Sequence, residues 1–209
     1  MNHLDELMQR YPVLVPIRAA IEAASRVLCD CYASAGKLLV CGNGGSAADA
    51  DHIVGELMKG YLKPRPLAGD LRARLLAADP VLGQALAEHL QGSLPAVNLT
   101  AGSALLSAFG NDVRPELGYA QAAFGHGRKG DALLGISTSG NASNVRSALV
   151  VGRAVGMTTI GLTGAGGGKM AGLCDILIAV PAARTFEIQE LHLPVYHCLC
   201  AMVEERFFP

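Results

Sequence analysis

The sequence predicts an α/β fold built on a five-stranded parallel sheet, and three observations favour this class. Five short apolar runs, each breaking into glycine or polar residues, are typical of buried strands. Helical patterns separate these runs, and strands that alternate with helices form parallel βαβ units with right-handed crossovers. The 209 residues, 51% hydrophobic and 17% charged, suffice for one domain with its own core. Together they indicate a flavodoxin-like layout with helices covering the sheet.

The elements follow one another in a regular order. An N-terminal helical segment is expected within residues 1–35, because apolar residues in 14–35 recur at helical spacing before Gly36. Strands are expected at 37–42, 94–100, 131–140, 157–164 and 175–181. Helices are expected between them at 46–58, 101–109, 112–124 and 141–155.

Two segments depart from this alternation. Residues 61–93 are longer than a connection requires, and they read as a proline-punctuated loop followed by one or two short amphipathic helices. We interpret them as an insertion in a single domain that spans 1–209. The last segment, 185–209, is helical in pattern but contains Pro194, which predicts a kink.

Composition excludes several classes of protein. The formal net charge is −1 and the basic residues are scattered, so we expect neither a nucleic-acid partner nor a membrane partner. The N-terminal residues are polar and lack the pattern of a signal peptide, and no apolar run reaches the length of a membrane span. We therefore expect a cytoplasmic protein whose six cysteines are reduced core thiols.

Two loops are candidates for anion binding, because ligands of parallel α/β sheets bind where strand ends meet helix N-termini. The first loop combines glycines with polar side chains, and the second carries three hydroxyls before a helix near Asn141. The same residues are also common as helix caps and turns. The candidates are Gly42, Asn43, Gly44, Gly45 and Ser46 in the first loop, and Ser137, Thr138 and Ser139 in the second.

Nucleotide binding is a weak alternative for these loops. The Gly-Lys-Ser/Thr ending of a phosphate-binding P-loop is missing, and the first loop departs from GxGxxG in its register.

His52 and Glu56 are four residues apart on the helix after the first loop, so both project from one face. Such a pair can bind a metal ion or act together on a substrate, although most are surface pairs. The C-terminal segment adds Gln189, His192 and His197. On a straight helix Gln189 and His197 would be ~12 Å apart at ~1.5 Å rise per residue, so spacing alone favours Gln189 with His192.

Five segments together carry a family resemblance. In chain order they are CGNGGSAADADHIVGE, FGND, GISTSGNASNV, LTGAGGGKMAGLCD and IQELHLPVYH. They resemble the sugar isomerase (SIS) domain family and, within it, the bacterial phosphoheptose isomerases. The resemblance covers most of the chain, with 61–93 as its main departure. It implies a three-layer SIS fold flanked by N- and C-terminal helices.

The resemblance also implies an activity and its site. It implies the conversion of sedoheptulose 7-phosphate to D-glycero-D-manno-heptose 7-phosphate, a precursor of surface polysaccharide, in a homotetramer with active sites between subunits. The base would be Glu56 and the acid His197. A divalent metal, normally zinc, would be held by His52, Glu56, Gln189 and His197. Substrate contacts would come from Asn43, Gly44, Gly45, Ser46, Glu56, Asn111, Asp112, Ser137, Thr138, Ser139 and Gln189.

The chain departs from the family pattern at three places. Ala142 stands where a serine usually follows the second loop, and Gly60 stands where a basic residue is frequent, with Lys59 beside it. Phe186 replaces an aspartate. These changes leave open an isomerase of another sugar phosphate. A non-catalytic SIS scaffold that binds the replication initiator and a sugar-phosphate sensor are further alternatives, although a scaffold has no need for a metal set.

Overall fold

The computed structural model describes residues 2–209 and contains one sheet of five strands, all parallel to their neighbours. The order β2-β1-β3-β4-β5 confirms the flavodoxin-like layout. This order reverses between β1 and β3, which is where open α/β sheets bind their ligands. The strands are β1 (Leu38–Cys41), β2 (Ala96–Asn98), β3 (Ala132–Ile136), β4 (Thr158–Thr163) and β5 (Ile176–Ala179).

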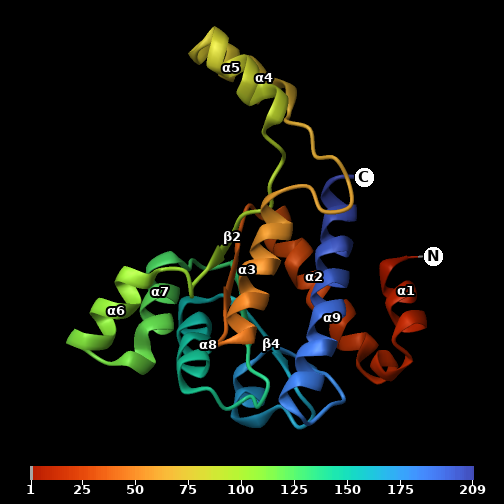
Figure 1. The fold of residues 1–209 in the computed structure, drawn as a ribbon, viewed down its shortest axis with the longest axis vertical. Coiled ribbons are helices and arrows are strands. Elements are labelled where there is room, and N and C mark those ends of the chain that lie inside the picture. The colour runs from red at the N-terminus through yellow and green to blue at the C-terminus, as the bar shows by residue number, and fades with distance from the viewer. Residues whose placement is uncertain (1) are drawn as a thin grey trace.

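Helices cover both faces of the sheet, giving three layers (Figure 1). Successive strand residues point to opposite faces, so Leu38 and Val40 join one core cluster while Leu39 and Cys41 join the other. The first cluster includes residues of α1 (His3–Arg10), α2 (Arg18–Ala33), α3 (Gly45–Met58) and α9 (Thr185–Phe207). The second includes residues of α7 (Gly118–His126) and α8 (Ser143–Val155).

Two predicted helices differ in their bounds, and proline explains both differences. The helix expected over 14–35 begins as a 3₁₀ turn, η1 (Pro12–Ile17), and becomes α2 only at Arg18. The helix expected over 112–124 is divided, since α6 (Ser103–Asp112) ends before η2 (Pro115–Leu117) and α7 begins at Gly118. Proline favours the start of a helix because it lacks a donor and has a fixed φ.

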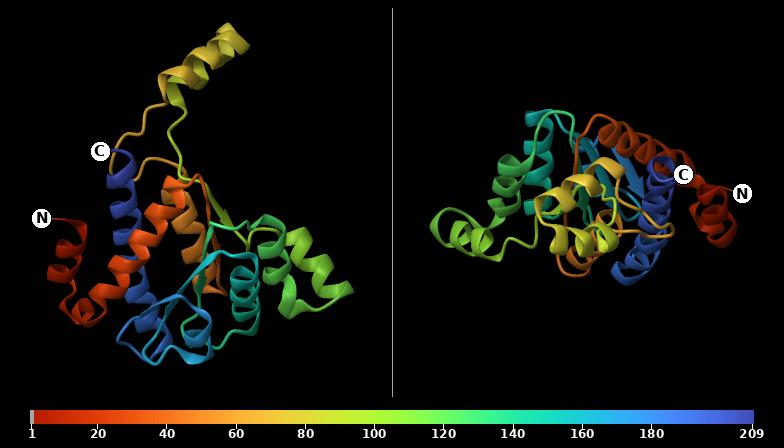
Figure 2. Two further views of the ribbon diagram at one scale, coloured as in Figure 1. Left: turned by 180° about the vertical axis from the view of Figure 1, so that it is seen from behind. Right: turned by 90° about the horizontal axis from the view of Figure 1, so that it is seen from above.

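The insertion forms a helical hairpin, α4 (Gly69–Ala78) and α5 (Pro80–His89), that projects from the three layers (Figures 1 and 2). No residue of α4 is buried. The two arms of the hairpin meet again at its base, where Pro66 and Gln91 form an antiparallel bridge and the Gly92 N–H donates to the Arg65 carbonyl at 2.7 Å.

The six cysteines form no disulfide; Cys31, Cys41, Cys198 and Cys200 are buried, as expected of core thiols, whereas Cys29 and Cys174 are half-buried. Burial raises the pKa of Cys41 to about 12, so this thiol is inert at neutral pH. No helix among residues 2–209 is both long and apolar enough to cross a membrane.

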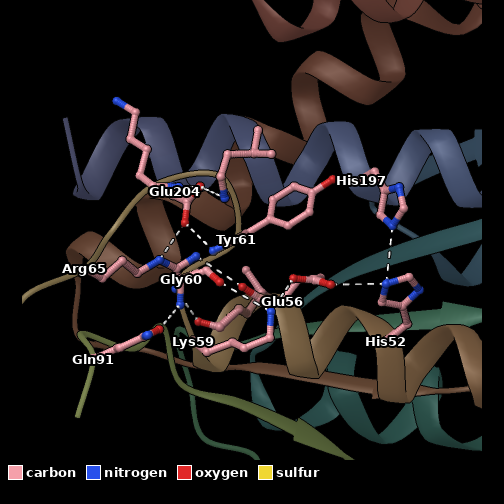
Figure 3. A network of polar contacts seen from close by, with 12 residues as sticks. His52, Glu56, Lys59, Gly60, Tyr61, Arg65, Gln91, His197 and Glu204 are labelled. Atoms are coloured by element: carbon pink, nitrogen blue, oxygen red, sulfur yellow. Dashed lines mark hydrogen bonds and ion pairs between the residues drawn. The ribbon is translucent and has the colours of Figure 1, made fainter. Parts of the chain in front are cut away.

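A buried ion pair joins the segment after α3 to the C-terminal part of α9 (Figure 3). Arg65 Nε donates to Glu204 Oε1 at 2.8 Å, and the two side chains are 0% and 1% exposed. Glu204 also accepts the backbone N–H groups of Tyr61, Leu62 and Lys63. Burial alone would raise the pKa of Glu204, but these hydrogen bonds and Arg65 hold it below its usual value.

The remaining donors of Arg65 bind the end of α3. Its Nη1 donates to the Leu57 carbonyl at 2.7 Å and its Nη2 to the Glu56 carbonyl at 3.1 Å. Carbonyls in the last turn of a helix lack intrahelical partners, so the guanidinium caps this helix. One ion pair thereby fixes the end of α3 relative to α9.

We expect Glu204→Gln to lower the free energy of unfolding by about 3–5 kcal/mol, because it leaves the buried Arg65 charge unpaired. The contribution of Glu204 should be lost as pH falls through its lowered pKa, since protonation removes the same charge. Urea denaturation at several pH values measures both effects.

Glu205→Gln is the matched control, because Glu205 is 54% exposed and pairs with Lys63 and His3 at the surface. It should leave the stability close to that of the wild type. Equal losses in the two variants would contradict this account of the buried pair.

Candidate functional site

The two candidate loops lie side by side at the point where the strand order reverses. The first follows β1 and the second follows β3, its neighbour in the sheet. A pair of reciprocal amide hydrogen bonds joins them: Asn43 Nδ2 donates to Asn144 Oδ1 at 2.9 Å, and Asn144 Nδ2 donates to Asn43 Oδ1 at 2.8 Å. Tyr119 supports the first loop by donating its hydroxyl hydrogen toward the Gly42 carbonyl at 2.8 Å. The loops therefore form one surface.

Each loop leads into a helix whose N-cap residue makes no side-chain cap. The N-cap of α3 is Gly44, at φ 56°, and the N-cap of α8 is Ala142. Side-chain caps are absent, but the carbonyls of Asn43 and Gly44 accept the N–H groups of Ser46 and Ala47. Within residues 2–209, the helix-start N–H groups without a hydrogen-bond partner are those of Gly45, Ser143 and Asn144. Two helix N-termini with partial positive charge at one surface suit the binding of an anion.

The second loop is tightly held from below. Gly140 adopts φ +65°, and a β-carbon there would collide with the backbone of Gly167. The Thr138 carbonyl accepts the N–H of Gly164, in the loop between β4 and η3 (Gly168–Leu173). Ser137 is buried, whereas Ser139 is exposed. This packing fixes the hydroxyls relative to the start of α8.

His52, Glu56 and His197 form a polar cluster between α3 and α9 (Figure 3). His52 Nε2 lies 3.2 Å from Glu56 Oε1 and 3.4 Å from His197 Nε2. The ring of Tyr61 packs against that of His197, with centroids 5.7 Å apart. The C-terminal helix thus presents His197, rather than His192, to the His52 and Glu56 pair.

Charges and burial set the chemistry of this cluster. Lys59 Nζ donates to Glu56 Oε2 at 2.9 Å, which supplies a positive charge beside the carboxylate. Partial burial, followed by the neighbouring His52, lowers the pKa of His197 below its usual value. His197 is therefore neutral at pH 7, the form in which an imidazole binds a metal.

The three side chains fit a divalent metal in their donor chemistry. Two imidazole nitrogens and a carboxylate oxygen suit zinc, and ligand atoms at zinc bonds of about 2.0–2.1 Å with tetrahedral angles lie about 3.3 Å apart. The two separations around His52 Nε2 have this size. As they lie in this structure, however, no three or more His, Cys, Asp or Glu side chains among residues 2–209 form a group that could hold a metal ion.

Gln189 lies at the other end of the helix pair. The side-chain amide of Gln189 rests on the first turn of α3, so close that a β-carbon on Gly45 would collide with it. Within residues 2–209, Gln189 makes no hydrogen bond to His52, Glu56 or His197. Gln189 faces the loop surface, while His197 lies two turns further along α9.

Asn111 and Asp112 lie at the end of α6, which packs on α7 and η2 (Figure 1). Both are exposed, and Asn111 Nδ2 donates to Asp112 Oδ1 at 2.9 Å. A single chain does not bring them to the histidine cluster.

His192 is fully buried, and neither of its ring nitrogens has a hydrogen-bond partner within residues 2–209. Burial lowers the pKa of His192 to about 4, with a smaller opposing effect of the Thr163 backbone. It is a neutral core residue beneath the loops.

The departures from the family pattern also have structural positions. Two basic residues lie near Gly60, where the family has a basic residue. Arg65 is buried in its ion pair with Glu204 and is therefore unavailable to a ligand, whereas Lys59 is exposed next to Glu56. Phe186 is 53% exposed at the start of α9, and Arg184 stacks on its ring at 4.8 Å.

Sequence reasoning missed Tyr196, which is 2% exposed and places its hydroxyl 3.0 Å from His52 Nδ1. Burial is the largest cause of its raised pKa, and Asp49 adds to it. Tyr196 directly precedes His197, but nothing in the spacing distinguishes it from the apolar residues around it.

Three comparisons place these features among known proteins. Residues 12–93 match the SIS domain family. The phosphoheptose isomerase of Rhodospirillum rubrum is 40% identical over 186 residues, which are 89% of this chain and 85% of that protein.

Two solved structures are similar over nearly the whole chain. The phosphoheptose isomerase of Neisseria gonorrhoeae has a TM-score of 0.75 at 32% identity, covering 97% of this chain and 95% of that one. The phosphoheptose isomerase of Francisella tularensis has a TM-score of 0.74 at 28% identity, covering 96% and 94%.

We expect Gly140→Ala to lower the free energy of unfolding by about 1–3 kcal/mol, because the new methyl meets backbone at a positive φ. Gly55→Ala is the control, since a β-carbon at Gly55 meets no other atom within 4 Å. That variant should gain roughly 0.5–1 kcal/mol from higher helix propensity. Chemical denaturation compares the two, and a neutral Gly140→Ala would contradict the close packing described here.

In the metal-free protein we expect His197 to titrate with a midpoint below 6.5, because burial and His52 both disfavour its charged form. His52→Ala should raise this midpoint by removing the second cause. Histidine ring signals followed by NMR over pH 4–9 provide the measurement. A midpoint at or above 6.5 in the wild type would contradict the partly buried environment described for His197.

Proposed function

Because the chain belongs to the phosphoheptose isomerase family of SIS-domain proteins, we propose that it converts sedoheptulose 7-phosphate to D-glycero-D-manno-heptose 7-phosphate. The chain is a sugar-phosphate isomerase on the strength of those relatives, and the choice of this ketose and aldose is the proposal. One observation carries it: the carboxylate of Glu56 and the imidazoles of His52 and His197 meet beside the helix that begins at the first candidate loop.

The phosphate would bind at the two loops. The N–H groups of Gly45, Ser143 and Asn144 at the two helix N-termini, together with the hydroxyls of Ser137, Thr138 and Ser139, would supply donors there without any lysine. Asn43, Gly44, Gly45 and Ser46 form the other wall. Because the phosphate lies at the opposite end of the sugar from the reacting carbons, its binding energy serves to position them.

The reaction moves one proton between two neighbouring carbons. Glu56 removes a proton from C1 of the ketose while His197 provides a hydrogen to the C2 carbonyl oxygen, which gives an enediol. Glu56 then returns the proton to C2, and the hydrogen of the O1 hydroxyl leaves to His197, so that C1 becomes the aldehyde. Every proton that leaves the substrate returns to it or to His197, and no redox partner is needed.

The same side chains would hold a divalent metal. We infer zinc from the two imidazoles and the carboxylate, with Gln189 as the fourth ligand that the family resemblance implies. Bound zinc supplies Lewis-acid polarisation of the carbonyl and hydroxyl oxygens. A carboxylate that is tightly bound to a metal is a weaker base, so Glu56 would serve as the base best if the metal were held mainly by His52, Gln189 and His197. Lys59, 2.9 Å from Glu56 Oε2, is placed to hold an oxygen of that carboxylate.

A homotetramer would complete the site. Asn111 and Asp112 lie on α6, away from the cluster of their own chain, so they would serve the site of a neighbouring subunit. We place the enzyme in the cytoplasm, where it would supply precursors of surface polysaccharide.

Lys59 and Phe186 favour one second candidate, an isomerase of another sugar phosphate. Lys59 bonds Glu56 where the family pattern has a basic residue one position later, and Phe186 stands in place of an aspartate near the loops. Both changes alter groups that would face the sugar rather than those that move the proton. The scaffold and sensor alternatives have no such observation in their favour.

The test is incubation of the purified protein with sedoheptulose 7-phosphate, with aldose formation followed by NMR with and without a chelator. Glu56→Gln and His197→Ala should each lower kcat by about 10²–10⁴, the size of a general acid or base contribution. Chelation should abolish turnover, and added zinc should restore it.

Glu190→Gln is the matched control, because Glu190 is an exposed carboxylate on the same helix. It should retain wild-type turnover. Absence of turnover in zinc-loaded wild type would refute the heptose substrate, and a panel of other ketose and aldose phosphates would then separate the second candidate from a scaffold or sensor.

A further inference from the structure

Tyr61 covers one side of the His197 imidazole. The two ring centroids are 5.7 Å apart and the ring planes make an angle of 38°, so the tyrosine lies over the imidazole at a tilt. The rings of His52 and Tyr196 meet His197 almost at right angles, with centroids 4.9 and 5.0 Å away. Rings favour such stacked and edge-on contacts at separations of about 4.5–7 Å. Of these three neighbours, Tyr61 alone comes from outside α3 and α9.

The backbone of Tyr61 is fixed to the helix that carries His197. Its N–H donates to Glu204 Oε1 at 2.8 Å, and the N–H groups of Leu62 and Lys63 donate to Glu204 Oε2. Glu204 lies seven residues after His197, so the two side chains project from the same side of α9. Figure 3 shows the Tyr61 side chain between these two residues. A carboxylate two turns away thus determines where the ring of Tyr61 lies.

His197 also borders a cavity of about 270 Å³ between α1 and α9, and Tyr61 forms part of the cavity wall. The α1 side of this wall includes the carboxylate of Glu6 and the imidazole of His3. Both are hydrogen-bonding groups for an imidazole that turns into the cavity. A second orientation is therefore open to the His197 side chain, in which it leaves His52.

We propose that Tyr61 is a positioning residue that blocks this second orientation and keeps the His197 imidazole turned toward His52 and Glu56. The ring acts by contact, since the hydrogen bond that Tyr61 makes within residues 2–209 is that of its backbone N–H. A catalytic side chain requires a rotamer that is locked by its surroundings. The effect on turnover rests on the proposed function, whereas the orientation of the ring does not.

NMR of the metal-free, full-length protein measures this orientation. In the wild type we expect nuclear Overhauser contacts between the ring protons of His52 and His197, whose centroids are 4.9 Å apart. Tyr61→Phe should keep these contacts, because it keeps the ring. Tyr61→Ala should lose them, because the imidazole then turns into the cavity. A wild type without these contacts, or a Tyr61→Ala variant that keeps them, would overturn the proposal.

Tyr11→Ala is the matched control. Tyr11 is an aromatic residue in the wall of the same cavity, and within residues 2–209 no ring contact joins it to His197. The substitution enlarges the cavity as Tyr61→Ala does, but it leaves Tyr61 over the imidazole. The contacts between His52 and His197 should therefore persist. Their loss in both alanine variants would show that cavity size sets the orientation, against the proposal.

Steady-state kinetics with zinc-loaded protein and sedoheptulose 7-phosphate is the second readout. Tyr61→Ala should lower kcat by about 10²-fold with KM little changed, as expected when a group that acts in the transition state is misplaced. Tyr61→Phe and Tyr11→Ala should both keep the wild-type kcat. A raised KM at unchanged kcat in Tyr61→Ala would assign Tyr61 to substrate binding and would contradict a positioning role.

The two readouts separate this proposal from the proposed function. If the NMR contacts respond as expected and the wild type shows no turnover, the isomerase assignment fails and the positioning of His197 stands. If the wild type converts sedoheptulose 7-phosphate and Tyr61→Ala keeps full kcat, the positioning role fails and the isomerase assignment stands.

Discussion

The ion pair between Arg65 and Glu204 holds together the two helices on which the site depends. Arg65 caps the carbonyls of Glu56 and Leu57 at the end of α3, while Glu204 lies on α9 two turns beyond His197. Glu204 also collects the N–H groups of the segment that carries Tyr61, whose ring packs on His197. Two buried charges are costly to desolvate, but here each guanidinium nitrogen of Arg65 and each carboxylate oxygen of Glu204 has a hydrogen-bond partner. The spacing of base and imidazole is thus set by contacts that lie outside the cluster.

The N-terminal ends of α3 and α8 lack side-chain caps, and the candidate anion-binding surface depends on this. Gly44 and Ala142 begin their helices without a side-chain cap, and the N–H groups of Gly45, Ser143 and Asn144 have no hydrogen-bond partner within residues 2–209. The paired amides of Asn43 and Asn144 keep those helix ends side by side. An anion receives donors from rigid backbone at this surface. The partial positive charge at this surface comes from the two helix N-termini and not from basic side chains. This agrees with the net charge of −1 for the chain.

The sheet and its order could be predicted from sequence because apolar periodicity and glycine turns are local signals. The bounds of two helices differ from the prediction because Pro12 and Pro115 begin the short 3₁₀ helices η1 and η2. The site was only partly predictable. His52 and Glu56 share a helix face, but spacing alone favoured His192 over His197, and the family resemblance was needed to select His197. Tyr196 could not be found at all, because its hydroxyl meets a residue 144 positions away. Contacts between distant segments leave no trace in a single sequence.

The hairpin of α4 and α5 has a consequence for how this chain can change in length. Its two arms return to a common base, where Pro66 pairs with Gln91 and the Gly92 N–H binds the Arg65 carbonyl. The two ends of the inserted segment are therefore held together where they leave the rest of the domain. Closing a longer or shorter loop between fixed ends alters the chain entropy only slowly with its length. The segment is thus a natural splice point, where another module can be exchanged while Arg65 keeps its bond to Glu204.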